Sequence, residues 1–128
     1  MTDLRHFTLA QARAFLPQLR KKLTEIRRIY IELNAIGFDV YHGTYRPGYH
    51  PDTLEAYPKS YHRFVHLARQ ILDEGIRIRS IEQGLADFPA VRANGEEVFL
   101  CWQIDETDIL FWHGKDEGFK ARRPIALF

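Results

Sequence analysis

Four side chains in the second half of the chain are of types that bind metal ions or transfer protons: Asp87, Cys101, Glu106 and His113. Carboxylates, thiolates and imidazoles are zinc ligands, and a carboxylate or an imidazole can also act as a general acid or base. One hypothesis is therefore a metal-dependent or acid–base enzyme that uses His113 with Asp87 or Glu106. It requires that the fold bring these side chains together.

The strand pattern around these residues argues against that assembly. Apolar runs on either side of residues 105–108 predict a hairpin with a two-residue turn at Glu106-Thr107. This register places Cys101 and His113 on opposite faces of the sheet and Glu106 at the tip. We therefore expect no catalytic residue here: Cys101 is a small buried hydrophobic residue, and His113 donates to a carbonyl at a strand end.

A second group of candidates follows the first predicted helix, where aromatic side chains alternate with cationic or titratable ones: Tyr41, His42, Tyr45, Arg46, Tyr49 and His50. Tyrosine offers rigid contact area and a hydroxyl group, and arginine stacks and forms bidentate hydrogen bonds. This segment, together with Trp112 of the predicted sheet, is the candidate surface for a ligand or a partner. The alternative is that it folds over the helices with its tyrosines half buried.

Two further histidines could hold a metal ion. His62 and His66 are four residues apart, so on a helix they share one face. Zinc sites use three or four protein ligands, and no third ligand accompanies this pair. We expect neither a bound metal nor another cofactor.

A basic strip could bind single-stranded nucleic acid, because Arg77 and Arg79 alternate along a predicted strand near aromatic residues. The 18 Lys and Arg residues are balanced by 17 Asp and Glu residues, and the formal charge is +1. No global field would therefore attract nucleic acid or an anionic membrane. Surface ion pairs would explain the same arginines, so nucleic-acid binding stays an alternative.

The elements that must position these residues begin with a long helix. Thr8 and Gln11 form a capping-box pattern, after which apolar residues recur in steps of three and four as far as Leu33. Pro17 predicts a kink or a break near the preceding turn, and Gly37 predicts the end. A long loop at 38–58 then leads to a second helix at about 59–74. The two helices are expected to pack antiparallel.

From residue 76 the period changes to that of strands. Asn94-Gly95 is typical of a two-residue type I′ turn, which would pair Val91 with Val98. We predict an α+β fold in which an antiparallel two-helix hairpin packs on an antiparallel β meander of three to four strands. The chain is interpreted as a single domain, 1–128, with a helical half at about 8–75 and a β half at about 76–128.

Both faces of the predicted sheet are largely apolar. We expect the helices to cover one face and the tail at 124–128, or a second subunit, to cover the other. The first residues lack a signal-peptide stretch, and no run of 18 apolar residues could cross a bilayer. A single cysteine excludes an internal disulfide. These features favour a cytoplasmic protein without a membrane partner.

The β half carries short motifs in a fixed order: Gly84-Leu85-Ala86-Asp87-Phe88-Pro89-Ala90, Leu100-Cys101-Trp102, Phe111-Trp112-His113 and Gly118-Phe119, with Arg122 or Arg123 after them. In this order they resemble a bacterial family of uncharacterised proteins, domain-of-unknown-function family 2203 (DUF2203). The opening, from Phe7-Thr8-Leu9 to Leu16-Pro17, is similar to that family's first helix with its internal proline. The family has no assigned activity, so the resemblance implies a prokaryotic soluble protein and supplies no catalytic residue.

The sequence thus leaves the function open. We expect a cytoplasmic binding or interaction module without catalysis, and surplus apolar surface favours a homo-oligomer or a protein partner. The enzyme and nucleic-acid hypotheses above are its alternatives.

Overall fold

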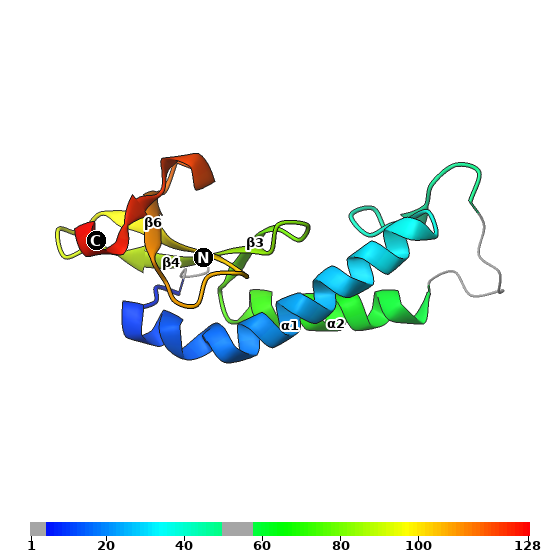
Figure 1. Ribbon diagram of the computed structural model, residues 1–128, viewed down its shortest axis with the longest axis horizontal. Coiled ribbons are helices and arrows are strands. Elements are labelled where there is room, and N and C mark those ends of the chain that lie inside the picture. The colour runs from blue at the N-terminus through cyan, green and yellow to red at the C-terminus, as the bar shows by residue number, and fades with distance from the viewer. Residues whose placement is uncertain (1–4, 50–57) are drawn as a thin grey trace.

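Two helices, α1 (Leu9–Ala35) and α2 (Lys59–Asp73), lie side by side and run in opposite directions (Figure 1). The computed structural model describes residues 5–49 and 58–128. The predicted capping box is confirmed: the Thr8 hydroxyl accepts from the Gln11 N–H at 3.1 Å, and the Gln11 side chain accepts from the Thr8 N–H at 3.0 Å. α1 continues through Pro17 without a break. Within the described ranges, no helix is long and apolar enough to span a membrane.

The second half of the chain forms a five-stranded sheet in which each strand pairs antiparallel with the next. Its strands are β3 (Arg77–Ser80), β4 (Leu85–Val91), β5 (Glu97–Gln103), β6 (Phe111–Gly114) and β7 (Arg123–Pro124). Two short 3-10 helices, η1 (Phe119–Ala121) and η2 (Ile125–Leu127), flank β7. The α+β class is confirmed. The predicted number of strands is wrong, because the chain after β6 returns to add β7 at the sheet edge.

The start of the predicted long loop contains a small two-stranded sheet of β1 (Phe38–Asp39) and β2 (Thr44–Tyr45). The Asp39 carboxylate accepts from the backbone N–H of Tyr41 at 3.0 Å, which stabilises the turn between the strands. Phe38 is buried and packs against the rings of Tyr45 and Tyr61. This sheet therefore closes the far end of the helix pair. The remainder of the predicted loop, at 50–57, lies outside the described residues.

One cluster of buried hydrophobic side chains joins the helices to the inner face of the sheet, which carries Ala86, Phe88, Ala90, Val98, Leu100, Trp102 and Trp112. Leu16 and Leu23 of α1 belong to the same cluster. The tail also packs here, since Phe128 contacts this core and lies 6.4 Å from the Trp112 ring. The expectation that the tail covers the opposite, outer face is therefore wrong.

In both predicted hairpins, the predicted pairing of the two strands is shifted by one residue from the observed pairing. Between β4 and β5, Val91 pairs with Glu97, and the turn is a longer one that ends on Gly95 with a φ of 87°. Between β5 and β6, the chain takes a loop at 104–110, and Cys101 pairs with Phe111. A shift of one residue moves every side chain of a strand to the other face.

Candidate functional site

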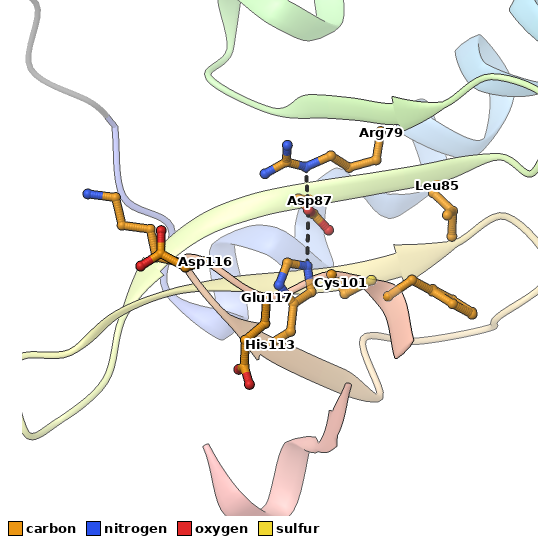
Figure 2. A pocket seen from close by; sticks show the side chains of 10 residues that line it. Arg79, Leu85, Asp87, Cys101, His113, Asp116 and Glu117 are labelled. Carbon is orange, nitrogen blue, oxygen red and sulfur yellow. Dashed lines mark hydrogen bonds and ion pairs between the residues drawn. The ribbon is translucent and has the colours of Figure 1, made fainter. Parts of the chain in front are cut away.

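The shifted register of β6 brings Asp87, Cys101 and His113 together on the outer face of the sheet (Figure 2). Asp87 is paired with Cys101 across β4 and β5, and His113 lies opposite Phe99 on the next strand. One candidate ligand atom from each residue lies within 4.8 Å of the other two, and all three side chains are buried. No other group of three such residues occurs in the part of the chain that the structure describes.

His113 is held by acceptors on both ring nitrogens. Nδ1 lies 2.9 Å from the carbonyl oxygen of Gly114, and Nε2 lies 3.1 Å from Oδ2 of Asp87. Because a carbonyl oxygen can only accept, Nδ1 carries the hydrogen in this contact. Burial lowers the pKa of His113, but the hydrogen bond with Asp87, assisted by contacts with Cys101 and Gly114, outweighs it and raises the pKa to about 10.

One carboxylate oxygen of Asp87 contacts both Arg79 and His113, and the other oxygen has no hydrogen-bond partner among the described residues. The Asp87 side chain is 1% exposed, and Oδ2 accepts from Nε of Arg79 at 2.7 Å as well as contacting His113. Oδ1 is buried and has no hydrogen-bond partner within residues 5–49 and 58–128. A buried carboxylate oxygen without a donor is costly and calls for a water or an ion.

The Cys101 sulfur also contacts the guanidinium group of Arg122. Nη1 of Arg122 lies 4.0 Å from Sγ. The same guanidinium forms a bidentate pair with Glu106, at 3.2 and 2.8 Å, and stacks between the rings of Phe111 and Phe119. Glu106 is therefore not a member of the cluster. It fixes Arg122, which contacts the cluster through the cysteine.

A cavity of about 370 Å³ opens beside the three residues. Arg79, Leu85 and Phe119 contribute to its wall, and the chain after β6 contributes Lys115, Asp116, Glu117 and Gly118 (Figure 2). Glu117 fixes this segment, because its carboxylate accepts from the Gly114 N–H at 2.8 Å and from both Nη groups of Arg123 at 2.6 and 2.9 Å. The cavity is thus bounded by a hydrogen-bonded turn.

The Tyr/His segment follows the end of α1 that lies away from β6 (Figure 1), and none of its described residues lines this cavity. Its side chains mostly make local contacts: His42 bonds Asp39 at 2.7 Å, Arg46 bonds Asn34, and Tyr45 packs on Phe38. Tyr41 and Tyr49 are exposed. His50 lies outside the described residues. The segment therefore contributes no residue to the cluster.

The remaining candidates are also separate from the cavity. His62 and His66 are exposed on α2, and the His66 ring lies 3.1 Å from Gln70. Trp112 is buried on the inner face, with the guanidinium carbons of Arg92 and Arg123 at 4.5 and 4.9 Å from its ring. It is therefore enclosed by the protein's own arginines.

Sequence reasoning missed the positions of Arg79, Glu117 and Arg122 around the cluster. The sequence suggests for Arg79 only a nucleic-acid contact or a surface ion pair, and it assigns Glu117 and Arg122 no role at the site. The signal that could have placed them is the number of residues in each of the two hairpin loops. A change of one residue in a loop shifts the strand pairing by one, which moves His113 and its neighbours to the other face of the sheet. Glu106 carried that signal: its carboxylate accepts from the Gln103 N–H at 2.8 Å and holds the start of the longer loop.

The arrangement suits a metal ion better than general-base catalysis. A histidine whose pKa is about 10 is protonated at neutral pH and cannot accept a proton there. A metal ion would displace that proton from Nε2, while the Nδ1–H bond to the Gly114 carbonyl orients the ring, as in many metal-bound histidines. Asp87, Cys101 and His113 supply three donor types that zinc accepts.

Comparison with known proteins places the chain in a family without assigning an activity. Neither a curated protein nor a solved structure gives a significant match. The family model described as "Uncharacterized conserved protein (DUF2203)" matches residues 5–125, which include every residue of the cluster and its cavity. The chain therefore belongs to the DUF2203 family of uncharacterised conserved proteins.

Proposed function

We propose that this protein is a metal-binding module that holds one zinc-type divalent ion between Asp87, Cys101 and His113. Three protein ligands with a fourth position open to a cavity form the arrangement of a catalytic zinc site. The proposal takes up the metal-dependent alternative that the sequence left open. It replaces the expectation of a module without metal.

The observation that carries the proposal is the unpartnered oxygen of Asp87. Oδ1 is buried, and no described residue donates to it, although it belongs to the same carboxylate whose Oδ2 contacts His113. A divalent ion bound there would satisfy this oxygen. The competing interpretation is a buried ion-pair network of Arg79, Asp87 and His113 without a metal.

Arg79 is compatible with such an ion because it binds Asp87 from outside the cluster. Its Nε donates to Oδ2 at 2.7 Å, and its side chain is 43% exposed. Hydrogen-bonded groups behind a ligating carboxylate orient it in metal sites. Arg79 would then hold the carboxylate in place while its other oxygen faces the ion.

Zinc content tests the proposal directly. Protein purified without an affinity tag, incubated with zinc and freed of unbound ion by gel filtration, is expected to hold about one ion per chain, the stoichiometry of a three-ligand site. The variants Asp87→Asn, Cys101→Ser and His113→Gln should each lose most of this zinc, as measured by elemental analysis. His66→Gln is the matched control, because it removes an exposed histidine outside the cluster and should leave the content unchanged.

A second readout identifies the ligands. Cobalt bound through Cys101 should show a thiolate-to-metal charge-transfer band that is absent in Cys101→Ser. If the wild-type protein holds no zinc after this treatment, or if the three variants retain as much as the wild type, the metal proposal is wrong and the ion-pair interpretation stands.

The finer predictions from the sequence accompany this proposal: a bacterial, cytoplasmic protein that forms a homo-oligomer or binds a protein partner. Exposed apolar side chains, among them Leu72 and Tyr41, support self-association. Light scattering coupled to size-exclusion chromatography measures it. A monomer at all micromolar concentrations would contradict the prediction.

A further inference from the structure

We infer that the cavity beside the cluster binds a small molecule through an oxyanion, a carboxylate or a phosphate, which the two Nη groups of Arg79 hold. The inference rests on the proposed metal centre, because the ion would supply the second attraction for the anion at its open coordination position.

Arg79 is fixed in place yet has unused donors. Its Nε is bonded to Asp87 at 2.7 Å, and its guanidinium carbon lies 4.8 Å from the centre of the Phe99 ring. Nη1 and Nη2 donate to no residue in the described ranges. A planar guanidinium that presents two parallel N–H groups matches a carboxylate or a phosphate. The fixed position reduces the entropy that binding would cost.

The charges beside the cavity favour an anion at its inner end. Arg79 pairs with the buried carboxylate of Asp87 through Nε at 2.7 Å. A divalent ion at the cluster would add two positive charges, so the ion and Arg79 together would exceed the Asp87 carboxylate and a Cys101 thiolate by one positive charge. In the rest of the wall, Glu117 is paired with Arg123 and Lys115 with Glu97, and the acidic Asp116 is exposed to solvent.

The shape of the cavity sets the size and character of the ligand. Its volume of about 370 Å³ is at the small end of the range for sites that bind small molecules. Leu85 and Phe119 give it an apolar side, and the Phe119 ring is held by Arg122 at 4.3 Å. A compact ligand with one oxyanion and an apolar or aromatic body fits these walls.

The variant Arg79→Gln isolates the role of the two Nη groups. The side-chain amide nitrogen of glutamine lies at the same position along the chain as Nε of arginine, so it can still donate to Asp87. The control is Arg77→Gln. Arg77 lies two residues earlier on the same strand and stacks on the same Phe99 ring at 5.0 Å, but it does not line this cavity.

The experiment titrates zinc-loaded protein with inorganic phosphate and, separately, with acetate, and follows binding by calorimetry. Wild type and Arg77→Gln should bind at least one of the two anions with equal affinity. Arg79→Gln, loaded until elemental analysis shows the same zinc content as wild type, should bind the anion roughly 10- to 100-fold more weakly, as expected for the loss of two charge-assisted hydrogen bonds. Preference for phosphate or for acetate then identifies the headgroup class.

The outcomes separate the anion site from the metal centre. If zinc-loaded wild type binds neither anion, or if Arg79→Gln binds them as well as wild type, the anion site is overturned while the zinc content still supports the metal. If wild type takes no zinc, the metal centre fails. Phosphate or acetate binding to that metal-free protein, lost in Arg79→Gln, would nevertheless support the Arg79 site.

Discussion

The two faces of the central sheet both bury side chains at its centre, but these side chains differ in chemistry. On β4, Asp87 is 1% exposed on the outer face, and its neighbour Phe88 is fully buried on the inner face. The same alternation puts Cys101 next to Leu100 and His113 next to Trp112. The inner face contacts the helices and is apolar. The outer face faces a hydrogen-bonded loop and carries an ion-paired cluster.

The difference in chemistry between the two faces indicates that they have different roles. Burying an apolar ring stabilises the fold, whereas burying a carboxylate and an imidazole costs free energy that their pairing only partly offsets. Apolar side chains in place of Asp87 and His113, like those on the inner face, would give a more stable sheet. The polar outer face is therefore better explained by binding than by stability. Substitutions on the two faces should have correspondingly different effects.

The largest expected effect on stability belongs to the inner face. Phe88→Ala should lower the free energy of unfolding by about 3–5 kcal/mol, because it leaves a cavity in the core shared by the helices and the sheet. Urea denaturation measures the loss. The folded variant should still take up zinc like the wild type. A loss below about 1 kcal/mol, or a folded variant without zinc, would mean that the two faces are not separable in this way.

On the outer face, the expected effect depends on pH. The pKa of His113 is raised from 6.5 to about 10 in the folded, metal-free protein, chiefly by its hydrogen bond with Asp87 acting against burial. A raised pKa stabilises the fold fully below about 6.5, and the contribution is lost as pH rises towards 10. His113→Gln should therefore cost about 3 kcal/mol at pH 6 and much less at pH 10.

Urea denaturation in the presence of a chelator measures this difference for wild type and variant at both pH values. The matched inner-face variant Phe88→Ala provides the control, because its cost should not change with the protonation of His113. A cost for His113→Gln that is equal at pH 6 and pH 10 would show that the histidine is not held as a cation by Asp87.

Local signals in the sequence predicted the helices well. The Thr8 capping box, the stripe as far as Leu33 and the glycine at position 37 each correspond to an observed feature of α1. Helix periodicity depends on residues three and four apart, so it is visible in a short window. The α+β class follows from the same kind of pattern.

The candidate site could not be placed because it depends on two loop lengths. The residue types at 87, 101 and 113 were recognised as chemically capable, but the predicted two-residue turn set Cys101 and His113 on opposite faces. The side chain of Glu106 holds the start of the longer loop instead. The predicted and observed strand pairings differ by one residue, which is a small difference in local energy. It nevertheless decides whether the three candidate ligands lie on the same face of the sheet.

The smallest expected effect on stability is that of Cys101→Ala on β5, and the comparison with its neighbour Leu100 gives the sharpest contrast between the two faces. Leu100→Ala on the inner face should cost about 2–5 kcal/mol, because Leu100 is fully buried in the apolar cluster. Cys101→Ala removes a single sulfur atom beside a polar cavity and should cost less than about 1 kcal/mol. Its zinc content should nevertheless fall to background, whereas folded Leu100→Ala should keep its zinc. If Cys101→Ala were as destabilising as Leu100→Ala and retained zinc, the cysteine would be a core residue like its neighbour, and the contrast between the two faces would not hold.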